Sequence, residues 1–384
     1  MKYRRFGKTE LSMPVISCGG MRYQHKWDDI PWDSVPRDRQ ENIERILAYA
    51  LEKGINHVET ARGYGSSEMQ LGYAFKQFSR ESFIIQTKVA PQATADEFLK
   101  IFEKSMAYLQ LDYVDLFALH GLNDPERIHW ALQPGGCLEA AQKLKADGRI
   151  KHLGFSTHAS THDIVDVVNT GAFDYINLHW YFINQLNGPA IEAAAQQDMG
   201  VFIISPSDKG GRLYDPPQKL VDLCAPLHPM AFNDLFCLSD PRVHTLSCGA
   251  ARPSDFDLHI EAVEQLDQAE SLLAPIIEKI KSEVAAVGGP DWYESWHQGI
   301  PDWRELPEKI NVKDIVRLWT WAKALNLTDF GRWRYNMMSA DCIWVPGSPV
   351  VDFDEKQMQL ALDSSPFADQ ILEILKESKK LFKK

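Results

Sequence analysis

Eight repeats of a short β-branched segment followed by a longer amphipathic segment constrain the fold of this chain more than any other feature. They occupy about the first 270 of its 384 residues. This alternation is typical of βα units arranged around a parallel sheet, in which each helix covers one face of the strands. The predicted strands are Val15–Cys18, His57–Thr60, Phe83–Lys88, Val114–His120, Lys151–Ser156, Tyr175–Trp180, Val201–Ser205 and Val243–Gly249.

The segments between these strands predict helices, among them Asn42–Lys53, Glu68–Phe78 and Ala95–Leu109. In the first of them, apolar residues recur near helical spacing and Gly54 follows as a C-cap. Eight βα units favour an α/β fold of the (β/α)8 barrel type over a doubly wound sheet, which has fewer strands and a glycine-rich first turn. The chain contains no G-x-G-x-x-G sequence of the kind such a turn needs.

The segments before and after the repeat region do not continue its alternation of strands and helices. Residues 3–13 predict an N-terminal β-hairpin, two short strands around a turn at Gly7, which suits a cap on the closed bottom of a barrel. From about Leu272 onward, helical runs such as Ile276–Val287 and Val312–Leu325 follow one another without a strand, and this part holds seven of the eleven tryptophans. We therefore predict two domains, a barrel over residues 1–271 and a mainly helical module over 272–384.

Charge and cysteine usage exclude several classes of function. The chain has 41 basic and 53 acidic residues and a net charge of −12, which disfavours a protein that holds nucleic-acid backbones. We find no secretory signal and no apolar run near the roughly 18 residues that span a bilayer. Six scattered cysteines indicate neither a disulfide framework nor a zinc site. We expect a cytoplasmic protein without a nucleic-acid or membrane partner.

Four polar residues fall at or just after successive strand ends: Glu59, Tyr64, Lys88 and His120. In a barrel of this kind, the carboxyl ends of the strands face the active-site mouth. A neighbouring ammonium favours phenolate and lowers the pKa of a tyrosine, which can then protonate an alkoxide formed by hydride transfer to a carbonyl. Taken singly, each residue also has a plain structural explanation, such as a barrel-layer ion pair of Glu59 with Lys88.

The surrounding segments resemble the aldo-keto reductase family. They are His57-Val-Glu-Thr-Ala-Arg-Gly-Tyr-Gly-Ser-Ser-Glu, Gln86-Thr-Lys, Leu116-Phe-Ala-Leu-His and Gly148-Arg-Ile-Lys-His-Leu-Gly-Phe-Ser-Thr-His, and their order and spacing match over residues 1 to about 270. The resemblance implies a (β/α)8 barrel that reduces aldehydes and ketones with NADPH and without metal. It makes Tyr64 the general acid, Lys88 the partner that lowers its pKa, and His120 the donor that orients the substrate.

Glu59 departs from the family pattern, which has an aspartate at the end of the second strand. The added methylene keeps the charge but moves the carboxylate by about 1.5 Å, the length of a C–C bond. Either the site has repacked to restore the pairing with Lys88, or the tetrad is weakened. A misplacement of a catalytic group by about 1 Å costs on the order of 10²-fold in rate, so Glu59 argues against a reductase with high turnover.

The resemblance also implies residues that bind the cofactor. Ser156 and Thr157 lie where the family contacts the nicotinamide carboxamide, and Asn177 lies where it more often has glutamine. Arg252, beside a helix N-terminus, suits the 2′-phosphate of NADPH, although a solvated loop arginine is an equal alternative. The resemblance favours NADPH over NADH, but Leu258-His259 stands where the family often has a Glu-Asn pair at the adenine, which makes this a preference only. The expected contact residues are Gly20, Met21, Ser156, Thr157, Asn177, Ser205, Pro206, Gly249, Ala250, Arg252 and Asp255.

The helical module resembles the extension of one branch of the family, which is ferredoxin-like and holds iron–sulfur clusters. The positions that match its ligand cysteines are Ala286, Gly289, Trp292, Trp296, Cys342, Val345, Ser348 and Asp352. One cysteine cannot hold a cluster that needs about four ligands, so we predict a degenerate extension without iron. Its tryptophans either fill the vacated core or form an aromatic docking surface for a protein partner.

Two hypotheses of different classes result. The leading one is an NADP-dependent aldo-keto reductase, an alcohol:NADP⁺ oxidoreductase that reduces small aldehydes or ketones with Tyr64 as general acid. The alternative is a catalytically weak, NADPH-binding regulatory or interaction protein, which Glu59 and the cluster-free extension favour. An iron–sulfur electron-transfer reductase is disfavoured by the missing cysteines.

Overall fold

A closed barrel of eight parallel strands forms the centre of the fold. The computed structural model describes residues 1–383, and the strands close in the order β10-β3-β4-β5-β6-β7-β8-β9. Their bounds are β3 Ile16–Gly19, β4 His57–Glu59, β5 Ile84–Val89, β6 Val114–His120, β7 Ile150–Ser156, β8 Tyr175–Leu178, β9 Gly200–Ile203 and β10 Thr245–Gly249. The predicted (β/α)8 barrel is confirmed, and the predicted strands differ from these by at most two residues at either end.

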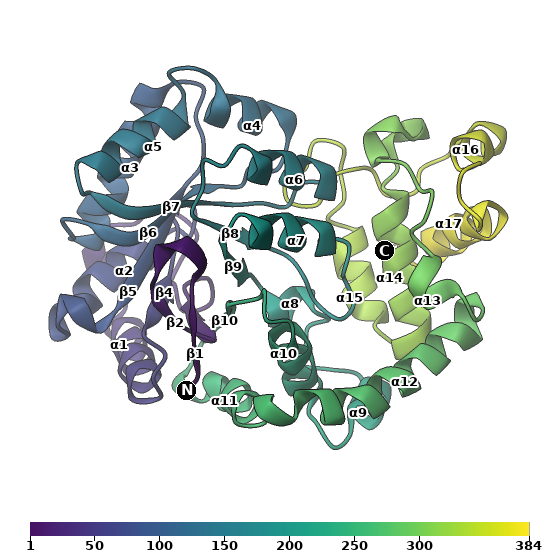
Figure 1. Cartoon of the computed structure of the whole chain (residues 1–384), viewed down its shortest axis with the longest axis horizontal. Helices are drawn as coiled ribbons and strands as arrows, with labels where there is room; N and C mark the ends of the chain where they lie inside the picture. The colour runs from purple at the N-terminus through teal and green to yellow at the C-terminus, as the bar shows by residue number, and fades with distance from the viewer. Residues whose placement is uncertain (384) are drawn as a thin grey trace. The chain divides into compact units, whose positions relative to one another are not determined.

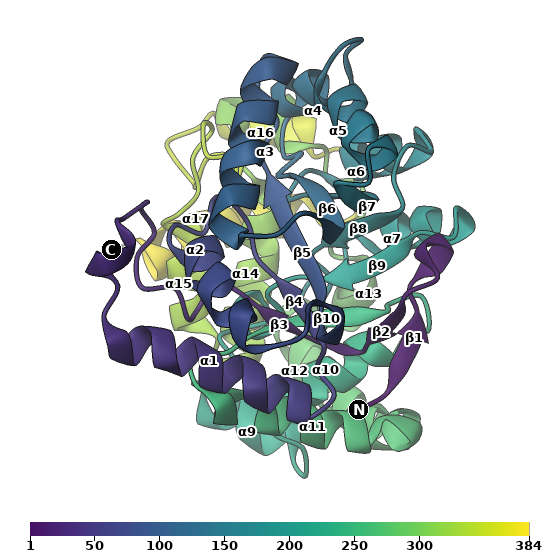
Figure 2. The same cartoon turned by 90° about the vertical axis from the view of Figure 1, so that its left-hand side faces the viewer.

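Helices flank the strands on the outside of the barrel (Figures 1 and 2). In Ala95–Leu109 (α3), the side chain of Thr94 accepts a hydrogen bond from the Glu97 backbone N–H, and Phe98, Phe102 and other apolar residues at helical spacing are buried. A capped N-terminus and one apolar stripe are what a surface helix requires. The other barrel helices are α1 Arg37–Glu52, α2 Ser67–Ala74, α4 Pro125–Leu132, α5 Cys137–Ala146, α6 Thr161–Asn169, α7 Gly188–Gln196 and α11 Asp257–Glu264.

The predicted N-terminal hairpin is also present. Strands Tyr3–Arg5 (β1) and Ser12–Pro14 (β2) pair antiparallel around the short helix Gly7–Thr9 (η1). Gly7 has φ +54°, a conformation that side chains disfavour, and an added Cβ there would meet the backbone of the residue before β9. Close packing of the turn against the amino end of β9 therefore requires glycine.

The chain divides into two compact units. The first comprises residues 1–207 and 233–267 and contains the barrel, and the second comprises residues 208–232 and 268 onward. Two helices, α8 Pro206–Lys209 and α10 Pro229–Ser239, contain residues of both units. No helix within residues 1–383 is long and apolar enough to cross a membrane. The second unit contains α9 Gln218–Cys224, α12 Ala269–Gly288, α13 Trp292–Ser295, α14 Val312–Leu325, α15 Thr328–Tyr335, α16 Glu355–Ala361 and α17 Ala368–Phe382.

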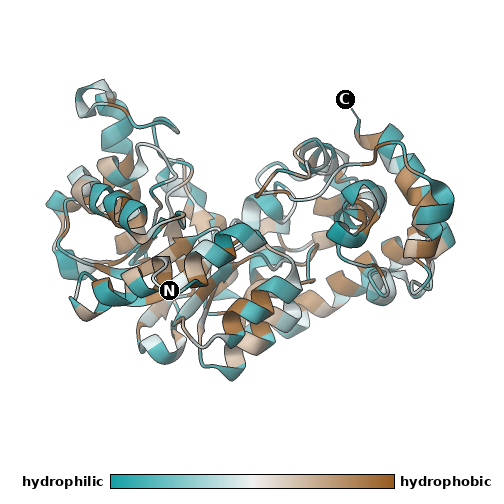
Figure 3. Cartoon of the chain, turned by 90° about the horizontal axis from the view of Figure 1, so that it is seen from above, coloured by the Kyte–Doolittle hydropathy of each residue, from teal (hydrophilic) through white to brown (hydrophobic). Residues whose placement is uncertain are grey.

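The second unit is helical, as the sequence predicts, and its core is built on tryptophan. Trp292 is completely buried, and its indole N–H donates to the Thr320 hydroxyl at 2.9 Å. Its ring packs edge-on against Trp319 and Phe367, with centroids 6.4 and 5.0 Å away. Hydrophobic and hydrophilic residues are mixed along the helices of the chain (Figure 3). Most residues of α14 are buried, whereas α17 buries one face. Trp292 therefore fills the core of this unit rather than forming an exposed surface.

Candidate active site

The four predicted polar residues lie at one end of the barrel. Glu59 ends β4, Lys88 is the penultimate residue of β5, and His120 ends β6, while Tyr64 follows in the loop after β4. Because the strands are parallel, their carboxyl ends meet at the same rim. All three strand residues are buried, Glu59 and Lys88 almost completely.

The Glu59 carboxylate is the centre of this cluster. One of its oxygens, Oε1, accepts hydrogen bonds from the Lys88 ammonium and from the Tyr64 hydroxyl, the latter at 3.2 Å. The other oxygen accepts from the Ser247 hydroxyl at 3.1 Å. Lys88 also donates to the Thr60 carbonyl at 2.9 Å. The longer side chain of glutamate thus keeps its pairing with Lys88 and reaches the tyrosine as well.

The loop after β4 holds Tyr64 beside His120. The Tyr64 backbone N–H donates to the Ala61 carbonyl at 2.9 Å. Gly65 follows with φ +54°, and an added Cβ would collide with the Lys26 carbonyl, so only glycine permits this turn. The Tyr64 ring meets the His120 ring edge-on, with centroids 5.7 Å apart. One substrate atom at this rim can therefore be within reach of both a phenol and an imidazole.

The electrostatics of Tyr64 differ from the sequence expectation. Burial raises the pKa of Tyr64 well above its ordinary value, and the adjacent Glu59 carboxylate raises it further. This direction is opposite to the one expected from a neighbouring ammonium. The main reason is burial, which disfavours the charged phenolate, and the Glu59 carboxylate adds to it through its negative charge and through the hydrogen bond that it accepts. Burial lowers the pKa of Lys88, and the pairing with Glu59 partly opposes this shift.

Two of the expected cofactor residues lie on neighbouring strands, and a third, Thr157, directly follows one of them. Ser156 of β7 stands opposite Asn177 of β8 in the strand register. The Ser156 hydroxyl accepts from the Gly121 N–H at 3.0 Å, and the Thr157 hydroxyl donates to the Leu122 carbonyl at 2.7 Å. Asn177 is completely buried, yet neither atom of its side-chain amide has a hydrogen-bond partner among the described residues. Asn177 thus keeps its full hydrogen-bonding capacity.

The next expected cofactor contacts lie at or just after the carboxyl ends of β3, β9 and β10. Gly20 follows β3 directly, and an added Cβ there would lie 2.7 Å from the Glu59 carbonyl, so a side chain is excluded. Met21 next to it is partly exposed. Ser205 follows β9 with φ +55°, and Pro206 begins α8. Gly249 ends β10 and Ala250 after it is buried.

Arg252 and Asp255 form a local pair after β10. The Arg252 guanidinium contacts Asp255 at 3.0 Å, and the Arg252 side chain is 75% exposed. Asp255 also accepts from the Ala251 backbone N–H at 2.8 Å and from the Arg252 backbone N–H at 3.3 Å, and the second bond caps the short helix Pro253–Phe256 (η5). His259, in α11, is buried and pairs with Asp234 instead of facing solvent. Arg252 therefore has a free outward face, whereas His259 is already engaged.

Two residues of the cluster were missed by the sequence reasoning, Ser247 and Thr60. Ser247 lies on β10, and its contact with Glu59 bridges two strands that are 188 residues apart in sequence. The strand alternation of β10 is the signal that predicts which of its residues face the barrel interior. Thr60 acts through its backbone carbonyl, which residue type does not reveal.

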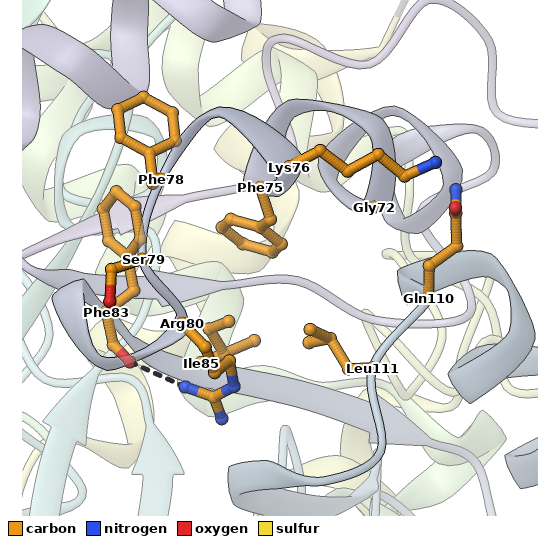
Figure 4. Close-up of a pocket in the computed structure, with 10 residues that line it drawn as sticks. All are labelled: Gly72, Phe75, Lys76, Phe78, Ser79, Arg80, Phe83, Ile85, Gln110 and Leu111. Atoms are coloured by element: carbon orange, nitrogen blue, oxygen red, sulfur yellow. Dashed lines mark hydrogen bonds between the residues drawn. The ribbon is translucent and has the colours of Figure 1, made fainter.

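One cavity lies apart from these residues (Figure 4). It has a volume of about 120 Å³ and is lined by residues of α2, the turns after it and the start of β5, such as Phe75, Arg80 and Ile85. The Arg80 guanidinium there donates to the Phe83 carbonyl at 3.0 Å. None of the expected catalytic or cofactor residues lines this cavity.

Comparisons with known proteins relate this geometry to a family. An aldo-keto reductase of Mycobacterium sp. (strain KMS) is 33% identical over 158 residues, which cover 38% of this chain and 52% of the relative. The NADH-specific methylglyoxal reductase of Escherichia coli is 25% identical over 195 residues, covering 45% of this chain and 58% of the relative. The chain thus spans about half the length of the curated relatives it matches.

A solved structure shares the fold. The aldo-keto reductase from Klebsiella pneumoniae in complex with NADPH superposes with a TM-score of 0.56 at 20% identity, covering 71% of this chain and 95% of that one. The expected ferredoxin-like character of the helical module is not borne out by these relatives. The sequence model described as the Aldo/keto reductase family matches residues 15–207, half of the chain. The chain therefore belongs to the aldo/keto reductase family.

Proposed function

We propose that the protein reduces small aldehydes or ketones to alcohols with a nicotinamide cofactor, and that Tyr64 supplies the proton. The observation that carries this proposal is the cluster at the carboxyl rim of the barrel, in which Tyr64 and Lys88 both contact Glu59 and the Tyr64 ring also contacts His120. Family membership and the relatives' reductase activities support the same class of reaction.

The residues at the rim fit a nicotinamide cofactor. The unpartnered, buried amide of Asn177 offers both a donor and an acceptor, which a carboxamide can satisfy, and Ser156 lies opposite it. The exposed guanidinium of Arg252 suits a 2′-phosphate, so we propose NADPH in preference to NADH. When bound, the reduced cofactor supplies a hydride to the carbonyl carbon. Two cysteines in the second unit are too few for an iron–sulfur cluster with about four ligands, so no electron-transfer step is included.

Proton delivery requires Tyr64 to exchange one hydrogen-bond partner for another. Its hydroxyl donates to Glu59, and it must turn to the substrate oxygen to protonate it. His120, beside the Tyr64 ring, can hold that oxygen by a hydrogen bond. A hydrogen bond to a charged group is worth about 1.5–3 kcal/mol, which corresponds to about 10- to 100-fold in rate. Lys88 stabilises the ionised form of Glu59 and so favours the hydrogen bond from Tyr64 to Glu59, which competes with proton delivery to the substrate.

The same hydrogen bond favours a second candidate function, a cofactor-binding regulatory or interaction protein with little turnover. The two candidates differ in whether Tyr64 is released from Glu59 when a carbonyl compound is present.

The test is NADPH oxidation with a panel of aldehydes, ketones and quinones. For the reductase, we expect measurable turnover that falls by about 10²–10⁴-fold in Tyr64→Phe, the usual range for loss of a general acid. Shortening the carboxylate in Glu59→Asp should raise the rate by about 10- to 100-fold, because the aspartate no longer reaches the tyrosine. Tyr113→Phe is the matched control, since Tyr113 directly precedes β6 at the opposite end of the barrel and should leave the rate unchanged.

Binding of NADPH without turnover in the natural protein and in Glu59→Asp would reject the reductase and support the second candidate. Turnover that persists in Tyr64→Phe would reject the assignment of the acid and move it to another group, with His120 tested next.

A further inference from the structure

The outer face of β10 carries a second cluster of polar groups, distinct from the one at the rim. Ser247 points inward, where its hydroxyl donates to Glu59, so the next residue, Cys248, points to the helices outside the barrel. Cys18 of β3 stands next to Cys248 in the strand register and shares this outward face. The space behind β3 and β10 thus contains thiols in place of the usual aliphatic side chains.

Three different side chains meet in this space: Asp234 of α10, Cys248 of β10 and His259 of α11. Each offers one ligand atom, and the three atoms lie within 4.8 Å of one another. All three residues are at most 2% exposed. His259 Nδ1 contacts one oxygen of Asp234, while the other oxygen, Oδ1, has no hydrogen-bond partner among residues 1–383. A second cationic group would stabilise this buried carboxylate, because one of its oxygens has no hydrogen-bond partner.

The chemistry of these three groups suits a divalent cation. Carboxylate oxygen, thiolate sulfur and imidazole nitrogen are the ligands of zinc in proteins. An isolated buried charge is costly, and a polar group without a partner is costly as well. Zn²⁺ with one carboxylate and one thiolate has no net charge, so the complete site could remain buried without this penalty.

We propose that Asp234, Cys248 and His259 bind one zinc ion. With metal–ligand distances of about 2.0–2.3 Å, ligand atoms of a tetrahedral site lie about 3.3–3.8 Å apart, which the observed limit of 4.8 Å accommodates with small side-chain shifts. On binding, the Cys248 thiol releases its proton, and Asp234 and His259 exchange their mutual contact for bonds to the metal. Asp234 binds through both of its oxygens, which span one short edge of a distorted tetrahedron, and Cys248 and His259 supply the other two ligand atoms.

This site is structural and separate from the proposed reaction. Its ligands come from three elements, so the metal ties α10 and α11 to β10. The loop that carries Arg252 and Asp255 connects β10 to α11, and the metal fixes both of its ends. No step of the reduction passes through the ion, and the proposal does not depend on the proposed function.

The test uses the full-length protein, stripped with a chelator, then dialysed against one equivalent of Zn²⁺ or Co²⁺ under reducing conditions. We expect about one zinc per chain by elemental analysis, and a thiolate-to-cobalt charge-transfer band that disappears in Cys248→Ala. Cys137→Ala is the matched control, because Cys137 is also a buried thiol of the first unit but lies on α5. Its variant should bind the metal like the natural protein.

A second readout does not depend on the variants folding. Zinc that binds only the native state raises the thermal midpoint of the natural protein as its concentration rises. The proposal is overturned if the stripped protein retains no zinc and its midpoint does not respond. It is equally overturned if zinc is retained but Cys248→Ala keeps both the metal and the cobalt band, which would place the ion elsewhere.

Discussion

The two compact units of this chain fill their interiors with different chemistry. In the barrel unit, Glu59, Lys88 and Asp234 are all at most 2% exposed, and each is held by a partner from another element. In the helical unit, the largest completely buried side chain is Trp292, with one N–H that Thr320 satisfies. The barrel unit thus buries ion pairs beside its large apolar core, whereas around Trp292 the helical unit packs aromatic rings.

This difference distinguishes candidate catalytic residues from residues that only pack the core. Buried ion pairs contribute little net stability because desolvation offsets the attraction, so a fold has small thermodynamic reason to keep them. Rings such as Trp292 contribute mainly through buried area and contacts. The charged interior is therefore where we place chemistry, and the aromatic interior is where we expect stability.

The largest effect should follow from breaking the charged pair. Lys88→Met leaves the Glu59 carboxylate buried without its cation, and we expect a loss of about 3–5 kcal/mol in the free energy of unfolding, measured by urea denaturation. The double variant Lys88→Met/Glu59→Gln removes both charges and should recover much of this loss. Equal stability of the single and double variants would show that the pair does not behave as a buried ion pair.

The aromatic interior should respond to loss of volume instead of charge. Trp292→Ala opens a cavity and removes the bond to Thr320, so we expect a loss of about 3–5 kcal/mol for unfolding of the helical unit. Trp344→Ala in the same unit is the control, because that ring is 38% exposed and its loss should cost well under half as much. A small effect at Trp292 would mean that the core does not depend on it.

The pKa of Tyr64 tests whether the buried charge of Glu59 acts on the neighbouring phenol. In Glu59→Asp, the carboxylate no longer accepts the hydrogen bond of the Tyr64 hydroxyl, so we expect the pKa of Tyr64 to fall. Ultraviolet difference titration of Glu59→Asp against Glu59→Asp/Tyr64→Phe isolates this one tyrosine. An unchanged titration would indicate that burial alone, and not Glu59, sets the pKa.

The positions of elements follow from the sequence where local signals decide them. Helices α3 and α14 begin and end at the predicted residues, because Thr94 and Asn311 cap their first turns and apolar spacing marks their buried faces. The rim residues follow as well, because parallel strands bring their carboxyl ends together.

Contacts that depend on side-chain reach could not be read from the sequence. The added methylene of Glu59 is evident from residue type, but its hydrogen bond to Tyr64 depends on side-chain geometry across a closed barrel. Asp234, Cys248 and His259 are 14 and 11 residues apart, which fits no metal-binding motif. Only the packing of two helices against β10 brings them together.

Lowering the pH should lower the free energy of unfolding of the barrel, because His57 is buried in it. This residue is completely buried, its Nδ1 bonds to the Ser17 hydroxyl at 2.7 Å, and burial with nearby Lys88 lowers the pKa of His57 to about 3. An unfolded histidine titrates near pH 6.5, so between about pH 6.5 and 3 the unfolded state binds more protons. Stability should fall as pH falls through this window, by up to about 1.4 kcal/mol per pH unit from this group. His57→Gln should flatten the profile, whereas His162→Gln, at an exposed histidine, should not.

The smallest effect is expected at the exposed edge of the site. Arg252→Ala removes a guanidinium that is held only by Asp255 on one side, so we expect the KM for NADPH to rise about tenfold, equivalent to about 1.4 kcal/mol. The KM for NADH, which lacks the 2′-phosphate, should not change, and Arg39→Ala, at an exposed arginine of α1, should alter neither. Because Arg252 is exposed, the variant should unfold like the natural protein. An equal rise in both KM values would assign Arg252 to the loop after β10 as a positioning residue and reject its role in choosing the cofactor.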